Sequence, residues 1–216
     1  MERDEKLTSE LRKFSKKLGV DIIGLADPKH FNRFDATFRP ESYLNDSKTV
    51  IIIGIHLYDI TLDAWYSSKK KNFHFADSIL EVHCHRIKAF LFKKGYNSKV
   101  MSYTPGFFLK DSAVLAGVGP IGKNNLLITK KFGSQVRLRA LTTNAPLVVG
   151  EPTLESEYCK ECKICQESCP ADAFQDGKYN KDTCLKYNLS HLKKLSEFTS
   201  IWCNVCIDSC PVGKRK

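Results

Sequence analysis

Two stretches of the sequence place apolar residues at the spacing of an amphipathic helix. The first, LTSELRKFSKKLG, stops at Gly19 and forms one apolar stripe from Leu7, Leu11, Phe14 and Leu18. The second, ADSILEVHCHRIKAFLFKKG, stops at Gly95 and collects on one face Ile79, Leu80, Ile87, Phe90 and Leu91. A glycine directly after the last apolar position is a common helix C-terminus. The pattern therefore predicts helices at residues 7–18 and at about 77–94.

Short apolar runs bounded by turn residues predict strands. VDIIGLADP indicates a strand that closes at Asp27-Pro28, TVIIIGIHL indicates a buried strand, and SKVMSY indicates a third. Two more strands are expected near residues 125–129 and 136–143, and a short helix is expected directly before Gly117. This mixture predicts an α+β (mixed α/β) fold. Around VVGEPTLESEY acidic and turn residues replace the apolar pattern, which divides the chain into domains at residues 1–150 and 151–216.

The composition is that of a globular protein, since 42% of the 216 residues are hydrophobic and can form a core. The longest aliphatic run, TVIIIGI, is far shorter than the ~20 residues that a membrane span requires. The N-terminal sequence MERDEKLTSE is too charged for a signal peptide. We therefore expect a cytoplasmic protein without a membrane segment.

The net charge of +10 belongs entirely to the first domain. Residues 1–150 hold 24 Lys and Arg against 14 Asp and Glu, whereas residues 151–216 hold 10 of each kind. The basic residues are scattered, and their one tight cluster, Lys69 to Lys71, follows WYSS in an expected loop. A solvated loop is favoured over a phosphate contact, so no nucleic-acid partner is expected.

The segment GVGPIGKN contains the pattern G-x-G-x-x-G, at Gly117, Gly119 and Gly122. It also falls one residue short of a P-loop, because Asn124 stands where the P-loop has Ser or Thr. Both motifs need a strand before the glycines and a helix N-terminus after them. Here the helix is expected before the glycines and the strand after them. The sequence therefore argues against a nucleotide site.

Cysteine spacing carries the strongest chemical signal, because eight of the nine cysteines fall between Cys159 and Cys210. CKECKICQESCP has the C-x2-C-x2-C-x3-C-P spacing of bacterial ferredoxins, in which three cysteines bind one cubane and the fourth binds a second. The segment that follows supplies a lone cysteine and then WCNVCIDSCP. We assign one 4Fe-4S cluster to Cys159, Cys162, Cys165 and Cys210. We assign the other to Cys169, Cys184, Cys203 and Cys206.

Zinc is the alternative for these cysteines, because paired C-x2-C units also build tetrahedral zinc sites. Zinc would account for eight cysteines as two sites. It does not account for the third cysteine at the x2 spacing, nor for the two C-P endings. A reducing cytoplasm argues against disulfides.

The ninth cysteine, Cys84, lies between His83 and His85 on the second predicted helix. Neighbouring residues on a helix diverge by about 100°, so these three side chains cannot converge on one ion. A packed Cys84 beside two half-exposed histidines is the favoured interpretation.

The segment AGVGPIGKNNLLITKKFGSQVRLRALTTNAPL, followed by the two cysteine groups, resembles the epoxyqueuosine reductase family and its shorter relatives. More distantly it is similar to corrinoid reductive dehalogenases. The resemblance covers roughly residues 20–213 and extends to TCLKYNLSHLKK, where Cys184 and His191 match the family's lone Cys and a later His.

This resemblance implies a base-off cobalamin between the two domains, reduced by electrons from the clusters. FMN is the alternative cofactor, because the N-terminal domains of the family resemble flavin-binding nitroreductase folds. The resemblance makes Gly119 and Gly122 part of a bend close to the corrinoid or the clusters. Lys123 and Asn124 become candidate polar contacts, with capping and solvation as the alternative.

Two departures from the family bear on function. Where epoxyqueuosine reductases carry an acidic proton donor, this chain reads SYTPG, which makes Tyr103 the candidate catalytic donor. The sequence also stops at Lys216 without the family's helical-repeat extension. We therefore expect a reductase of a small molecule rather than a tRNA-modifying enzyme, with a ferredoxin or flavodoxin as its electron donor. A non-catalytic electron carrier is the alternative.

Overall fold

The computed structural model describes residues 2–102, 106–175 and 177–213. It contains two compact units, each assembled from three stretches of the chain. The first unit consists of Met1–Ile55, Ile79–Gly119 and Arg137–Leu154. The second consists of His56–Ser78, Pro120–Val136 and Glu155–Lys216. The cysteine region therefore shares its compact unit with two stretches that come from the first 150 residues.

The first unit is built on a four-stranded sheet with the strand order β1-β2-β6-β5. Its strands are β1 (Ile22–Ala26), β2 (Thr49–His56), β5 (Ser98–Val100) and β6 (Val136–Thr143). β1 pairs with β2, and β5 with β6, in antiparallel register. Every residue of β2 except its last is buried, which explains why this strand is a continuous apolar run rather than an alternating one.

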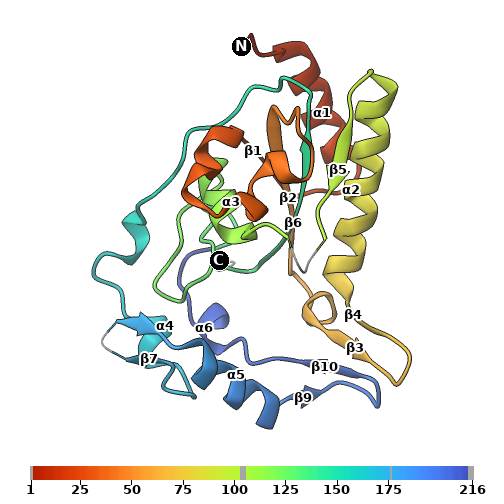
Figure 1. Cartoon of the computed structure of the whole chain (residues 1–216). Helices are drawn as coiled ribbons and strands as arrows, with labels where there is room; N and C mark the ends of the chain where they lie inside the picture. Colours follow the sequence, from red (N-terminus) through yellow and green to blue (C-terminus); the bar gives the residue numbers. More distant parts are fainter. Residues whose placement is uncertain (1, 103–105, 176, 214–216) are drawn as a thin grey trace. The chain divides into compact units, whose positions relative to one another are not determined.

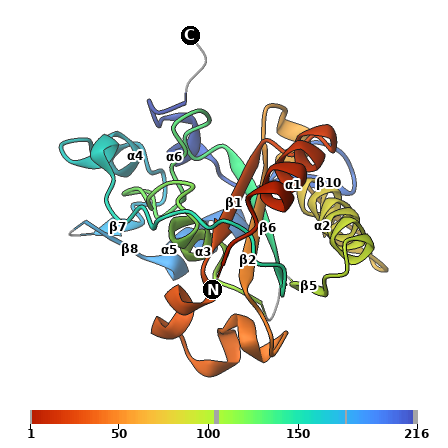
Figure 2. The same ribbon diagram turned by 90° about the horizontal axis from the view of Figure 1, so that it is seen from above.

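Helices cover both faces of this sheet, as Figure 1 and Figure 2 show. α1 (Glu5–Lys17) and α2 (Phe75–Lys93) lie on one face, where Phe14 stacks on Phe90 with ring centroids 4.7 Å apart. α3 (Leu109–Leu115) lies on the other face and contacts β1. The mixed fold of helices and strands that the sequence predicts is confirmed.

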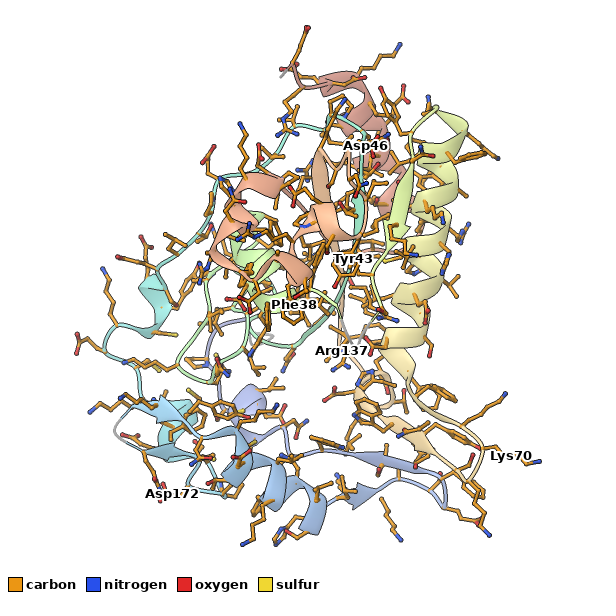
Figure 3. All side chains as sticks on the ribbon, viewed as in Figure 1. Phe38, Tyr43, Asp46, Lys70, Arg137 and Asp172 are labelled. Atoms are coloured by element: carbon orange, nitrogen blue, oxygen red, sulfur yellow. The ribbon has the colours of Figure 1, made fainter. Side chains whose placement is uncertain are left out.

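Three short 3-10 helices follow β1, at Pro28–Arg33, Ala36–Phe38 and Pro40–Ser42. Their aromatic rings pack against two phenylalanines that precede α3. Phe38 lies 5.1 Å from Phe108 and Tyr43 lies 5.4 Å from Phe107, between ring centroids. Figure 3 shows Phe38 and Tyr43 among these side chains. The proline-marked loop of the sequence is thus fixed by aromatic packing.

The helical stripes are largely as predicted. Leu7, Leu11 and Leu18 are buried on the N-terminal helix, and α2 buries Leu80, Ile87 and Leu91. The assignment of Ile79 to the buried face of α2 is wrong, because 39% of its surface is exposed.

Cys84 is a core residue, as predicted. It is fully buried, and its thiol lies 4.0 Å from the carbonyl oxygen of Ala140 on β6. Burial raises the pKa of the thiol to about 12, so it stays protonated at neutral pH. Of its two neighbours, His83 is half-buried and His85 is exposed.

The strand predicted near residues 125–129 is wrong. The chain instead makes turns with isolated bridges, from Ile121 to Leu127 and from Thr129 to Gly133. Asn125 has a φ of +58°, and the hydroxyl of Thr129 accepts from the backbone N–H of Phe132 at 3.1 Å. These two turns interrupt any regular extension, although Leu127 and Ile128 are buried as their apolar character indicates. A helix enters the glycine segment, as predicted, and within residues 117–135, all of them described, no helix leaves it.

The second unit contains a four-stranded sheet with the order β4-β3-β10-β9 and a two-stranded hairpin. The sheet strands are β3 (Trp65–Ser67), β4 (Asn72–His74), β9 (Lys193–Lys194) and β10 (Thr199–Ile201). The hairpin strands are β7 (Phe174–Gln175) and β8 (Lys178–Tyr179). The helices are α4 (Ile164–Glu167), α5 (Lys181–Ser190) and α6 (Val205–Asp208), with 3-10 turns at Ile60–Asp63 and Glu157–Cys159.

The basic cluster Lys69 to Lys71 occupies the predicted loop, which connects β3 to β4 and leaves all three lysines exposed. Figure 3 shows Lys70 pointing away from β3 and β4. In the part of the chain that the structure describes, no helix combines the length and the apolar character that crossing a membrane requires.

Candidate metal centre

Four cysteines of the second unit, three from one short stretch and one from near its C-terminal end, line one cavity. They are Cys159, Cys162, Cys165 and Cys210. Lys123, Asn124 and Ile128 complete part of the wall. Cys165 and Cys210 are buried, whereas Cys159 and Cys162 are half-buried. These are the four cysteines that the spacing assigns to one cluster.

The thiols of this first group act on one another electrostatically. Burial raises the pKa of the Cys165 thiol, and the neighbouring Cys210, Cys159 and Cys162 raise it further, in that order. Four thiolates gathered in a partly buried space repel each other unless a positively charged core is bound between them. The donor set therefore fits a thiolate-bound metal group.

The second assigned group is seen only through the electrostatic effect of its thiols on Cys206, since no group of three or more His, Cys, Asp or Glu side chains placed to hold a single metal ion occurs among the described residues. Burial is the main cause that raises the pKa of the Cys206 thiol to about 12, followed by the thiols of Cys203 and Cys184. Cys165 and Cys169 contribute less to the same shift. Cys165 lies on α4 and Cys206 on α6, and these two helices contact each other, so the two groups are neighbours.

Two short helices each lie between a cysteine assigned to one group and a cysteine assigned to the other. α4 contains Cys165 and is followed by Cys169, and α6 contains Cys206 and is followed by Cys210. α4 and α6 contact each other. In each Cys-x3-Cys pair, one cysteine is assigned to the first group and the other to the second. The second cysteine of each pair lies just past the helix C-terminus. Each helix therefore ties both groups together.

Hydrogen bonds from nitrogen reach the sulfurs of the second group. The backbone N–H of Ala173 donates to Sγ of Cys169 at 3.4 Å, and Nδ2 of Asn188 donates to Sγ of Cys184, also at 3.4 Å. The phenol of Tyr179 has a raised pKa, because it is partly buried and hydrogen-bonded to the Cys184 thiol. Two of the four sulfurs, those of Cys169 and Cys184, thus have hydrogen-bond donors, as ligands of a metal group usually do.

The segment GVGPIGKN packs against the cysteine loops through its last residues. Nζ of Lys123 donates to the carbonyl oxygen of Lys160 at 2.8 Å. Asn124 is buried, and its Nδ2 donates to Oγ of Ser134 at 3.2 Å and to the carbonyl oxygen of Cys206 at 3.4 Å. A Cβ at Gly122 would lie 2.6 Å from Ile128, so this glycine is required by close packing.

Comparisons with known proteins place the chain among reductases. No protein-family model matches the sequence. The chain is 26% identical over 250 residues to the epoxyqueuosine reductase of Cyclobacterium marinum, a match that covers 96% of this chain and 79% of the relative. It is 28% identical over 195 residues to the epoxyqueuosine reductase of Leadbetterella byssophila, a match that covers 83% of this chain and 63% of the relative. The chain is a homologue of the epoxyqueuosine reductases. The relatives' names support an oxidoreductase.

A second group of relatives is more distant. The tetrachloroethene reductive dehalogenase of Sulfurospirillum multivorans is 32% identical over 114 residues, which cover 47% of this chain and 23% of the dehalogenase. The similarity is therefore confined to a part of each protein.

Solved structures share the fold. A crystal structure of selenomethionine-labelled epoxyqueuosine reductase matches with a TM-score of 0.74 at 22% identity, covering 96% of this chain and 66% of that one. An epoxyqueuosine reductase with a tRNA-Tyr stem loop matches with a TM-score of 0.72 at 21% identity. This match covers 96% of this chain and 65% of that one. A reductive dehalogenase studied for B12-dependent dehalogenation matches with a TM-score of 0.69 at 18% identity. This match covers 95% of this chain and 31% of the dehalogenase chain. The chain thus spans about two thirds of the length of these epoxyqueuosine reductase chains.

The remaining candidates from the sequence lie apart from the cysteine groups or outside the described residues. Tyr103, the residue in the position of the family's acidic donor, is outside the described residues. Gly119 is buried at the end of the first unit's second stretch. His191, which matches a histidine of the epoxyqueuosine reductases, is exposed at the end of α5 and stacks on Tyr187 at 4.1 Å.

Two residues near the sulfurs were missed by the sequence analysis. Asn188 and Tyr179 both contact Cys184, yet neither is part of a motif. The available signal for Asn188 was its position one helical turn after Cys184 in a segment expected near the cluster.

Proposed function

We propose that this chain is an iron-sulfur reductase in which two 4Fe-4S clusters pass low-potential electrons to a cobalamin-type cofactor in the N-terminal part. The observation that carries the proposal is the cavity lined by four ferredoxin-type cysteines, with the other four in the same compact unit, in a homologue of epoxyqueuosine reductases. Ferredoxin-type spacing supports iron-sulfur clusters rather than zinc at both groups.

The residues present fit such clusters. Cys159, Cys162, Cys165 and Cys210 would hold one cluster, and Cys169, Cys184, Cys203 and Cys206 the other. Each cluster, when bound, supplies reversible one-electron transfer. The chain places Cys165 on α4 and Cys206 on α6, and it buries Cys165 and Cys210. It donates hydrogen bonds to the sulfurs of Cys169 and Cys184.

The cobalamin part of the proposal is supported by the relatives. A dehalogenase of the same fold was studied for B12-dependent dehalogenation, and the sequence resembles that group. We assign no ligating side chain to a corrinoid and expect the base-off form, without a protein histidine as lower ligand. Tyr103 is the proposed proton donor, on the resemblance of SYTPG to the family's acidic segment. A flavin-using reductase and an electron carrier are the competing readings.

A nucleic-acid substrate is the second candidate. An epoxyqueuosine reductase of this fold was solved with an epoxyqueuosine-modified tRNA stem loop. The two candidate substrates are therefore a small molecule and a tRNA stem loop. The scattered basic residues favour the small molecule.

Titration of the anaerobically reconstituted protein with cob(II)alamin, followed by electron paramagnetic resonance, tests the proposal. We expect the spectrum to change from base-on to base-off, and the Tyr103→Phe variant to give the same spectral change while turnover falls. A hydroxyl that donates a proton contributes about 10²- to 10⁴-fold to rate, so the loss should be of that order. An unchanged spectrum, with no cobalamin retained on gel filtration and with clusters intact, would favour the carrier or flavin readings.

A further inference from the structure

Asn188 is a polar residue inside a helix that is otherwise half-buried or exposed. Only 3% of its surface is accessible, and it is the one residue of α5 that is buried. Asparagine is a poor residue for a helix interior, and a buried amide is unfavourable unless its donors and its acceptor are paired. A leucine here would favour both the helix and the burial. The amide must therefore be explained by its partners.

The Asn188 amide uses both of its ends. Nδ2 donates to the carbonyl oxygen of Cys184 at 2.9 Å and to Sγ of Cys184 at 3.4 Å. Oδ1 accepts from the backbone N–H of Cys203 at 2.6 Å. One side chain thus joins two cysteines of the second group that are far apart in sequence. No other residue type of this size has a donor and an acceptor so placed.

We propose that Asn188 is a positioning residue for the second cluster, which holds Cys184 and Cys203 together and raises the reduction potential of that cluster. The inference rests on the proposed function. Reduction places one more negative charge on a cluster and its sulfurs, and an N–H that points at a sulfur stabilises this charge. The first group of cysteines has no contact with Asn188 among the hydrogen bonds of the described residues. The effect should therefore be confined to one of the two clusters.

The test uses the full chain with both clusters reconstituted anaerobically, in a redox titration followed by electron paramagnetic resonance. The Asn188→Asp variant keeps an oxygen for the Cys203 N–H and loses the donor to sulfur. We expect it to retain eight iron per chain and to shift the reduction equilibrium of one cluster at least tenfold toward the oxidised form, which is about 59 mV for one electron. The other cluster should keep its potential.

The Asn188→Leu variant removes both ends of the amide. We expect it to hold about four iron per chain, or, if it holds eight, to show the same lowered potential. The matched control is Asn180→Ala, which removes the N-cap of the same helix, where Oδ1 accepts from Thr183 N at 3.0 Å, without touching a cysteine sulfur. Its potentials should be those of the unsubstituted protein.

The inference is overturned if both Asn188 variants keep eight iron and unchanged potentials, or if Asn180→Ala shifts the potential equally. A failure of the proposed function gives a different result, because the unsubstituted protein would then bind no iron-sulfur cluster. If the leucine variant does not fold, the aspartate variant decides.

Discussion

The Cys169→Ala variant should lose about half of its iron and sulfide, falling from about eight to about four of each per chain. Its sequence neighbours in CKECKIC should keep their cluster. The reason is the crossed assignment, since Cys210 lines the cavity of Cys159, Cys162 and Cys165, whereas Cys169 is not among the residues that line it. Iron and sulfide analysis of the reconstituted variants measures the effect.

Double substitutions make the assignment specific. Cys169→Ala combined with Cys203→Ala should still hold about four iron, because both residues serve one cluster. Cys169→Ala combined with Cys162→Ala should hold almost none. Cys84→Ala is the matched control, since Cys84 is buried in the first unit, and it should hold about eight. Additive iron loss in the Cys169 and Cys203 pair would contradict the crossed assignment.

The Gly133→Ala variant should be destabilised by about 3 kcal/mol or more in unfolding free energy, because the change combines overpacking with backbone strain. Gly133 has a φ of +56°, and a Cβ there would lie 2.0 Å from the carbonyl oxygen of Val212. The obstacle is backbone, which cannot rotate away as a side chain can. Val212 follows Cys210 by two residues, so the same change should also weaken the first cluster. Denaturant unfolding of the variant measures the loss.

Gly177→Ala is the control for the backbone conformation alone. Gly177 has a φ of +75°, but no atom would lie within 4 Å of an added Cβ. Its substitution should cost only the left-handed strain of about 1–2 kcal/mol. Equal destabilisation by the two changes would show that the contact with Val212 does not matter.

The sequence predicted the elements whose pattern is local and repeated. Leu7 and Leu11, or Leu80 and Ile87, recur at helical spacing, and burial follows that spacing. The prediction that Ile79 is buried was wrong because Ile79 is adjacent to Leu80, and neighbouring residues on a helix cannot both face the core equally. The prediction of a strand at residues 125–129 was wrong because apolar character indicates burial and not backbone conformation. The turn at Asn125 and the hydrogen bond of Thr129 decided the conformation.

The four cysteines that line one cavity could be grouped from the sequence, because metal-ligand spacing is a local property, and the assignment of the other four stays a prediction. Asn188 and Tyr179 were not, since their importance comes from contacts with Cys184 and Cys203 that only the folded chain makes. In sequence Asn188 resembles an ordinary polar residue on a helix surface. Lys123 and Asn124 were singled out by motif, but their partners, Lys160 and Cys206, belong to loops far along the chain.

Iron, acid-labile sulfide and zinc, measured together on the anaerobically reconstituted full chain, test the central claim most directly. Two cubane clusters bound by eight cysteines predict about eight iron and eight sulfide per chain. They also predict an electron paramagnetic resonance signal that develops on reduction. About two zinc per chain, with no sulfide and no such signal, would contradict the account.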